Sequence, residues 1–189
     1  MKKPELREKL RAARREHVDQ LPEVMRGLVF RHPPAQLLQK IATDAVIGLY
    51  HAGPYEAPTA HYTTYFHENG YTIALPRFAS NKSPMEFAVH VDPFGESDLV
   101  TGPFGMLEPR TEAETVVPDV LLIPLIGFTA NGDRLGQGGG HYDRWLAEHP
   151  GRIAIGLAWD VQLCDALSTE PHDQRLDAVI TPTRMYGPF

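Results

Sequence analysis

The feature that most constrains the fold of this chain is a near-continuous apolar run at residues 120–128. A strand with apolar side chains at successive positions is covered on both faces, because neither face meets water. Strands of this kind belong to parallel sheets that carry helices on both sides. Pro124 stands inside the run and has no amide hydrogen for the strand ladder, so it weakens the prediction of one unbroken strand. The run predicts a buried parallel strand.

Apolar and helix-like segments alternate along the rest of the chain. Residues 45–50 and 71–75 are predicted strands, and residues 58–69 form a helical pattern between them that Gly70 ends. This alternation predicts right-handed parallel crossovers, with a ligand crevice at the carboxyl ends of the strands. We therefore expect a three-layer α/β/α fold with a mostly parallel sheet, built as a single domain over residues 1–189. The other expected elements are helices at 3–17 and 142–149, strands at 87–91, 152–159 and 177–181, and a proline- and glycine-rich surface loop at 93–109.

Length, composition and charge limit the classes of function. A chain of 189 residues with 42% hydrophobic and 22% charged residues is typical of one soluble globular domain. The charged amino terminus lacks the apolar core of a signal peptide, and no apolar stretch is long enough to span a bilayer, so we expect a cytoplasmic protein with no membrane partner. The net charge of -6 argues against a nucleic-acid partner. Cys164 is the only cysteine and is interpreted as a small buried hydrophobe.

The predicted amino-terminal helix carries two stripes. Leu6, Leu10, Ala13 and His17 recur at spacings of three and four residues, which is typical of a helix face turned toward a core. A second stripe is positively charged and consists of Lys3, Arg7, Arg11 and Arg14. The spacing alone leaves two interpretations of this basic stripe open, a solvated helix face or a local patch that binds an anion.

A glycine-rich segment follows the predicted buried strand and precedes a helix. Four of the five residues from 136 to 140 are glycine, a cost in conformational entropy that is expected where a backbone approaches a ligand closely. Free amides at the amino end of a helix form a site for phosphates. The P-loop motif is absent, and a dinucleotide fingerprint would need glycine where His141 stands. Arg134 and Asp143 add a cation and a hard oxygen ligand, the pairing that a Mg²⁺-nucleotide needs, although a mobile surface turn is the plain alternative.

The segment from Arg134 to Arg144, with the pattern R-L-G-x-G-G-G-x-Y-D-R, resembles the signature of the 5-formyltetrahydrofolate cyclo-ligase family, also called methenyltetrahydrofolate synthetases. Shorter blocks similar to the family's motifs are Lys3-x-x-Leu6-Arg7, Glu56-x-x-Thr59, Leu75-Pro76-Arg77 and Glu108-Pro109. The chain departs from the family pattern in the loop, where some members carry basic side chains at the positions of Gln137 and Gly139 and most carry an aromatic at His141. These departures bear on which side chain neutralises the transferring phosphate.

The resemblance implies a fold of the ribose-5-phosphate isomerase type. It also implies ATP- and Mg²⁺-dependent cyclisation of 5-formyltetrahydrofolate to 5,10-methenyltetrahydrofolate through a phosphorylated formyl group, with release of ADP and phosphate. By resemblance, ATP would be held by Lys3, Pro4, Glu5, Leu6, Arg7, Arg134, Leu135, Gly136, Gln137, Gly138, Gly139, Gly140, His141 and Tyr142. The folate would be held by His51, Glu56, Phe104 and the loop residues Gln137, Gly138, Gly139, Gly140 and His141. Mg²⁺ would be held by Asp143 and Asp173, with Asp177 as a competing ligand.

Arg134 and His141 are the expected catalytic residues, Arg134 through charge stabilisation and His141 through proton transfer. The sequence leaves open that Glu56 is an ordinary helix-start carboxylate, that Asp173 is a solvated loop residue and that His141 is a solvated or core histidine. Two rival functions remain. One is a sugar-phosphate isomerase or other phosphoryl-transfer enzyme, and the other is a non-catalytic nucleotide- or folate-sensing module. The expected partner is the small folate, with or without a polyglutamate tail, and a monomer is expected.

Overall fold

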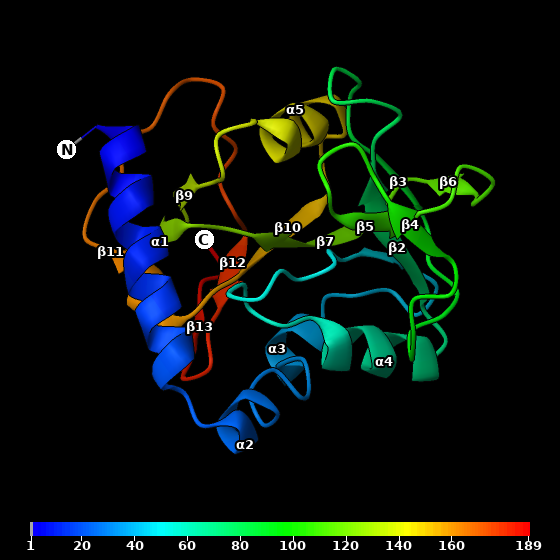
Figure 1. The fold of residues 1–189 in the computed structure, drawn as a ribbon, viewed down its shortest axis with the longest axis horizontal. Helices are drawn as coiled ribbons and strands as arrows, with labels where there is room; N and C mark the ends of the chain where they lie inside the picture. Colours follow the sequence, from blue (N-terminus) through cyan, green and yellow to red (C-terminus); the bar gives the residue numbers. More distant parts are fainter. Residues whose placement is uncertain (1) are drawn as a thin grey trace.

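A computed structural model describes residues 2–189, which form a large, mostly parallel sheet with helices on both faces (Figure 1). Within those residues the central sheet has eight strands, in the order β13-β12-β10-β7-β1-β2-β3-β6. Their bounds are Met185–Tyr186, Ala178–Ile180, Ile153–Leu157, Val120–Pro124, Val46–Gly48, Thr72–Arg77, Glu86–Val89 and Thr115–Val116. The predicted α/β class and the mostly parallel sheet are confirmed.

The five inner strands from β12 to β2 pair in parallel. At the two edges, β13 pairs antiparallel with β12, β3 pairs antiparallel with β2, and β6 pairs antiparallel with β3. From β1 the chain first moves to β2 on one side, and later returns to β7, β10 and β12 on the other side. The order of the strands therefore reverses between β1 and β7. In open α/β sheets, a crevice forms outside the carboxyl ends of the strands at such a point.

Two crossover helices cover opposite faces of the sheet. Helix α4 (Ala60–Glu68) connects β1 to β2 on one face, and α5 (His141–Glu148) connects β7 to β10 on the other (Figure 1). Side chains of β7 alternate between the two cores: Leu122 packs in the cluster that contains Phe66 of α4, and Leu121 packs in the cluster that contains Trp145 of α5. This burial on both faces explains why β7 is apolar at successive positions.

Helix α1 (Lys3–Gln20) extends three residues beyond the predicted end and stands beside the sheet (Figure 1). Its residue Leu10 packs with Ile126 and Leu135 in a third apolar cluster. The helical segments that the sequence patterns did not indicate are short, namely α2 (Glu23–Arg26), α3 (Ala35–Leu38) and the single turn η1 (Asp160–Gln162). Across residues 2–189, no helix combines the length and apolar composition that a membrane span requires.

Two sequence predictions were wrong in detail. The single strand expected at 120–128 ends at Pro124, and the chain starts a new strand, β8 (Gly127–Thr129), in a small sheet with β9 (Arg134–Leu135) and β11 (Leu163–Cys164). The side-chain amide of Gln162 donates to the carbonyls of the two residues between β7 and β8, so both carbonyls have a hydrogen-bond partner where the strand breaks. The surface loop expected at 93–109 contains a hairpin of β4 (Leu99–Thr101) and β5 (Leu107–Pro109).

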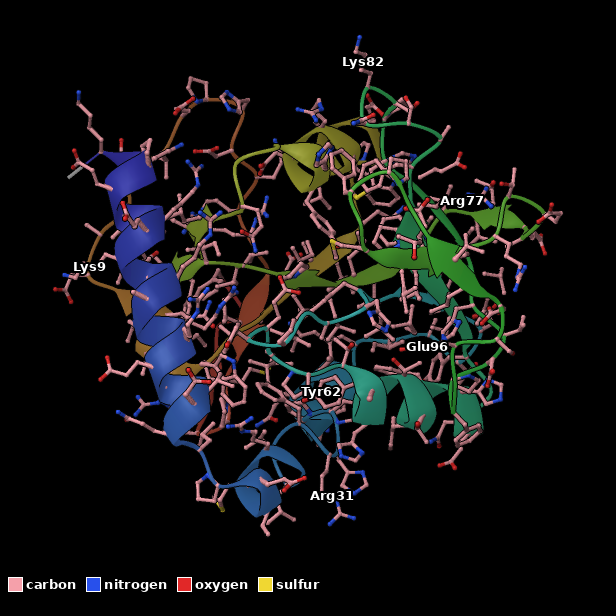
Figure 2. All side chains as sticks on the ribbon, in the orientation of Figure 1. Lys9, Arg31, Tyr62, Arg77, Lys82 and Glu96 are labelled. Carbon is pink, nitrogen blue, oxygen red and sulfur yellow. The ribbon has the colours of Figure 1, made fainter. Side chains whose placement is uncertain are left out.

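Two motif residues that contribute to the resemblance have structural roles. Arg77 is buried, and its guanidinium binds Glu86 at 2.7 Å and the carbonyls of Arg110 and Ala113, which fixes the turn before β6 (Figure 2). Glu108 is buried against Gly102, where an added Cβ would overlap its carboxylate. Cys164 is half-buried rather than buried, and burial raises the pKa of its thiol.

Candidate functional site

The basic stripe of α1 lies against the glycine-rich loop. The Nε–H of Arg7 donates to the carbonyl of Gly136 at 2.9 Å. The Nη2 of Arg11 donates to the carbonyl of Gln137 at 3.2 Å and to its side-chain Oε1 at 2.8 Å. Because residues four apart share one side of a helix, both cations reach the same loop. The stripe is therefore not a face that contacts only solvent.

Arg14 and Lys3 extend the stripe in both directions. Arg14 is 8% exposed, and in the described part of the chain its buried Nε has no hydrogen-bond partner. Burial lowers the pKa of Arg14, and the nearby carboxylate of Glu56 opposes that effect. Near the start of α1, the Nζ of Lys3 lies 2.8 Å from Asp173 and 3.0 Å from Glu170. Two cations of the stripe, Arg7 and Arg11, thus contact the loop, while Lys3 and Arg14 contact other segments beside it.

Glycine is required at two positions of the loop. Gly138 has φ 113° and Gly140 has φ 65°, in the region that favours glycine. Gly140 is the N-cap of α5, so the loop leads directly into the amino end of that helix. A Cβ added at Gly138 would lie 3.6 Å from the guanidinium carbon of Arg7. The amides at the start of α5 and the cations of α1 therefore lie close together, an arrangement suited to phosphate oxygens.

Arg134 and Asp143 form a buried ion pair beside the loop. The Nη2 of Arg134 lies 2.6 Å from Oδ1 of Asp143, and their side chains are 4% and 16% exposed. Among residues 2–189, the buried Nε of Arg134 has no hydrogen-bond partner, so the guanidinium retains an unused donor. Its guanidinium carbon also lies 5.9 Å from the centre of the Tyr142 ring. The two residues therefore hold each other in place.

The two expected metal ligands lie near each other. The backbone amide of Gln174, next to Asp173, donates to Oδ1 of Asp143 at 3.0 Å. Asp177 lies elsewhere, because its Oδ2 accepts a hydrogen bond from the amide of Ala154, in the first half of β10. No cluster of three or more potential ligands occurs within the described residues, so the chain offers two carboxylates rather than a complete metal cage. Two carboxylates suit a Mg²⁺ ion that is also held by nucleotide phosphates and water.

The ion pair between Lys3 and Asp173 makes a testable contribution to stability. Burial opposes ionisation of Asp173, but the hydrogen bonds from Lys3 and from the Glu170 amide outweigh it, so the pKa of Asp173 lies below the ordinary 3.8. Burial likewise opposes the charge of Lys3, and its two carboxylate partners outweigh that effect and raise its pKa above 10.5. The stabilisation from Asp173 is lost as pH falls through its lowered pKa, and that from Lys3 is lost as pH rises through its raised pKa.

We therefore expect Lys3→Met to lower the free energy of unfolding by about 1 kcal/mol near neutral pH, with a smaller effect in strong acid and strong base. Denaturant unfolding of both proteins across the pH range measures this difference. A loss of equal size at every pH would show that the ion pair contributes nothing and that the effect has another cause.

A cavity of about 410 Å³ lies at the carboxyl end of β1, between the sheet and α4. Its lining includes two of the expected folate residues, His51 and Glu56, together with Thr63 of α4, His90 and Glu96. Figure 2 shows Glu96 on the segment that passes above α4. The volume falls in the range of small-molecule sites. No residue from 136 to 140 lines this cavity within the part of the chain that the structure describes.

Glu56 connects the cavity to the loop. Its Oε1 accepts a hydrogen bond from Nε2 of Gln137 at 3.3 Å, and its Oε2 accepts one from the amide of Gly53 at 2.9 Å. Helix α4 begins at Ala60 with Thr59 as N-cap, so Glu56 precedes the helix, and its carboxylate hydrogen-bonds to Gln137 and Gly53 rather than to amides of α4. The carboxylate instead stands where the cavity meets the loop.

Phe104 lies away from this cavity, at the tip of the hairpin between β4 and β5. The residue is 44% exposed, and the centre of its ring lies 4.8 Å from the ring centre of Phe78 and 5.4 Å from that of His141. Burial, assisted by the charge of Arg144, lowers the pKa of His141. The Nη2 of Arg144 lies 3.1 Å from Nδ1 of His141, which assigns the proton of the neutral ring to Nε2. The structure thus places Phe104 beside the loop, with the second aromatic ring Phe78.

The remaining expected nucleotide residues mostly support the loop. Leu6 and Leu135 pack in the apolar cluster beneath α1, and Pro4 and Glu5 lie in the first turn of that helix. The residues expected to hold ATP did not include Arg11 and Arg14, although the sequence places both in the basic stripe. The sequence analysis also missed His90, which follows β3 and lines the cavity. A turn rather than a helix or strand separates it from its partner Asp98, so no periodic pattern indicated the pair.

Comparison with known proteins gives consistent results. The model of a family described as the 5-formyltetrahydrofolate cyclo-ligase family matches residues 1–182. A 5-formyltetrahydrofolate cyclo-ligase of Escherichia coli is 39% identical over 97 residues, which covers 48% of this chain and 53% of the relative. One from Mycolicibacterium smegmatis is 33% identical over 123 residues, with 62% of this chain and 63% of the relative covered. The chain thus spans about half the length of the first of these relatives and somewhat more of the second.

Solved structures share the fold. A 5,10-methenyltetrahydrofolate synthetase of Aquifex aeolicus has a TM-score of 0.77 at 24% identity, with 100% of this chain and 93% of that chain covered. One from Mycoplasma pneumoniae has a TM-score of 0.69 at 23% identity, with 95% and 98% covered. These likenesses extend over nearly the whole of both chains, so the architecture described above is shared with those proteins.

Proposed function

The chain belongs to the 5-formyltetrahydrofolate cyclo-ligase family, and from this premise we propose that it converts 5-formyltetrahydrofolate to 5,10-methenyltetrahydrofolate with ATP and Mg²⁺, releasing ADP and phosphate. One observation supports this most strongly. Gln137 binds Arg11 of α1 at 2.8 Å and Glu56 of the cavity at 3.3 Å, so one side chain joins the anion-binding loop to the small-molecule cavity. A reaction between a nucleotide and a second substrate needs two such sites in contact.

The chemistry matches the groups at the site. A formyl oxygen is a poor leaving group, so transfer of the γ-phosphate to that oxygen converts it into one that can depart. Atom N10 then attacks the activated carbon, and phosphate leaves. We propose that Arg134, Lys3 and Arg7 and the loop amides offset the charge on the phosphoryl oxygens, since preorganised charges stabilise such a transfer.

Mg²⁺, when bound, would neutralise charge between the nucleotide phosphates, and we assign Asp143 and Asp173 to hold it. His141, whose lowered pKa keeps its ring neutral near pH 7, offers Nε2–H as a donor beside the loop. We further propose that Phe104 and Phe78 contact the folate by stacking.

The proposal also covers the organisation of the molecule. We propose a single domain over residues 1–189 with the three-layer arrangement of the ribose-5-phosphate isomerase type, acting as a monomer in the cytoplasm. Its partner would be the small folate, with or without a polyglutamate tail, and not a nucleic acid.

An activity assay tests the function. Purified protein is mixed with 5-formyltetrahydrofolate, Mg²⁺ and ATP, and the near-ultraviolet absorption of the methenyl product is followed together with ADP. We expect one ADP for each methenyl product. If a sugar phosphate supplied in a parallel assay is converted instead, the result would favour an isomerase. Tight binding of the folate or nucleotide without product would favour a sensing module.

Asp143→Asn tests the assigned metal ligand. The amide keeps the size of the carboxylate and can still contact Arg134, but it lacks the charge that a hard cation prefers. We expect the Mg²⁺ concentration for half-maximal rate to rise by about tenfold or more, in line with losing one ligand contact. Asp177→Asn is the matched control, because that carboxylate caps β10 away from the loop. An unchanged Mg²⁺ requirement in Asp143→Asn would remove the metal role.

A further inference from the structure

A histidine and an aspartate form a pair at the wall of the cavity. His90 directly follows β3, is 7% exposed and lines the cavity. Its Nδ1 lies 2.9 Å and 3.0 Å from the two carboxylate oxygens of Asp98. The amide of Val91 donates to Oδ2 of Asp98 at 2.8 Å, which fixes the carboxylate. The ring of His90 is therefore held in one orientation.

The pairing leaves one ring nitrogen of His90 available. A carboxylate only accepts hydrogen bonds, so Nδ1 carries the proton of the neutral ring and Nε2 keeps a lone pair. Within residues 2–189, no protein group hydrogen-bonds that Nε2. A nitrogen base whose other nitrogen is oriented by a carboxylate is the arrangement that general bases use.

Most of the other polar groups of the cavity are already engaged. Glu56 uses both oxygens for Gln137 and Gly53. The Nε2 of His51 lies 2.8 Å from Glu96, and that pair is more exposed. The hydroxyl of Tyr50 donates to a backbone carbonyl, and burial raises its pKa well above 10.0. Thr59 and Thr63 donate to carbonyls in the same way. Among the described residues, His51 and His90 each keep one ring nitrogen without a protein partner, but the side chain of His90 is 6% exposed and that of His51 is 34% exposed. His90 is therefore the base that is held within the cavity wall.

The proposed reaction needs such an atom. When N10 attacks the activated formyl carbon, it still carries its hydrogen, and in that state it has no lone pair to expel phosphate. The N10–H bond must break with its electrons remaining on nitrogen. Those electrons then form the second bond to carbon, and the carbon–oxygen bond breaks with its electrons leaving on phosphate.

We propose that Nε2 of His90, oriented by Asp98, accepts the proton that N10 loses during ring closure. This inference rests on the proposed function, because it assigns a role within that reaction. The proton passes from His90 to solvent after product release, so the ring returns to its neutral form. Asp98 is a positioning residue that keeps the proton of the resting ring on Nδ1.

Single-turnover kinetics test the assignment, because ADP formation and methenyl formation are followed separately. In His90→Gln we expect the rate of methenyl formation to fall by about 10²-fold, while the rate of ADP formation and the KM for ATP change by less than about threefold. Asp98→Asn should lower the methenyl rate by about 10-fold to 10²-fold, since it removes the group that orients the ring. His32→Asn, at an exposed histidine outside the site, is the control and should leave both rates unchanged.

Two further measurements separate a proton acceptor from a merely structural role. The methenyl rate of the unsubstituted protein should fall at acidic pH, and His90→Gln should lack that limb. Added imidazole should restore the methenyl rate of His90→Ala by about tenfold or more, because it can occupy the space of the lost ring and accept the proton. The pH profiles must be read against the other charged groups near the dyad and in the cavity lining, which are Arg26, His51, Glu56, Asp92 and Glu96.

The outcomes distinguish the two proposals. If the unsubstituted protein forms no methenyl product, the proposed function fails. If that protein is active but His90→Gln keeps the methenyl rate and the acidic limb, only the role of His90 is overturned. An equal fall in ADP and methenyl formation, without rescue by imidazole, would also overturn it. Should His90→Gln fail to fold, Asp98→Asn and the imidazole experiment decide the question.

Discussion

Replacement of Arg134 by alanine is expected to lower methenyl product turnover by about 10²-fold or more, as is typical when one preorganised charge-stabilising group is lost. The side chain is 4% exposed beside the loop, and its Nε has no partner in the described part of the chain. A buried donor without a partner costs stability, so a ligand that satisfies it gains binding energy. Steady-state kinetics with ATP and 5-formyltetrahydrofolate measure the effect.

The Arg134 experiment needs a control for folding, because the substitution also leaves Asp143 without its ion-pair partner. Arg152→Ala provides it: that arginine is also paired with an aspartate, Asp119, at 2.6 Å, but lies at the amino end of the strands. Rates are compared per folded molecule, with the folded fraction taken from denaturant unfolding. Near-normal turnover in folded Arg134→Ala would contradict its catalytic role.

Gly138→Ala is expected to raise the KM for ATP by about tenfold or more. The backbone at Gly138 has φ 113°, where an L residue is strained by about 1–3 kcal/mol, so the loop must change shape to relieve it. A change of loop shape there is expected to disturb the hydrogen bond from Arg7 to the carbonyl of Gly136, two residues before Gly138. Substrate titration of the initial rate measures the KM.

Gly70→Ala is the matched control for the loop. Gly70 also has a positive φ, 84°, and an added Cβ there would meet nothing within 4 Å. It follows α4, on the opposite face of the sheet from α5, so its substitution should change stability but not the KM for ATP. If the two variants have the same KM as the unsubstituted protein, the backbone conformation at Gly138 does not contribute to nucleotide binding.

Much of the fold could be predicted from local patterns. The apolar run identified β7 because that strand is buried on both faces, and the three- and four-residue spacing identified α1. Pro124 indicated that the strand could be interrupted. The new strand β8 that follows was not predictable, because it forms only by pairing with β9 and β11. The hairpin of β4 and β5 was missed because strands of three residues are too short to show a hydrophobic period.

The candidate site was predictable where one segment carries several of its residues. The loop from Gly136 to Gly140 and the basic stripe of α1 were each visible in the sequence, and the structure brings them into contact. The pair of His90 and Asp98 was not predictable, because the turn between them sets their distance rather than a helix or strand period. The neighbours of Phe104 were not predictable either, because its contacts with Phe78 and His141 depend on the hairpin of β4 and β5.

The path of the formyl oxygen tests the central claim most directly. The protein is supplied with ATP, Mg²⁺ and 5-formyltetrahydrofolate whose formyl oxygen is a heavy isotope, and the released phosphate is analysed by mass spectrometry. If the γ-phosphate is transferred to that oxygen, every phosphate released with a methenyl product carries the heavy isotope. Methenyl product accompanied by unlabelled phosphate would contradict the account, because the loop and its cations would then serve ATP hydrolysis without activating the formyl group.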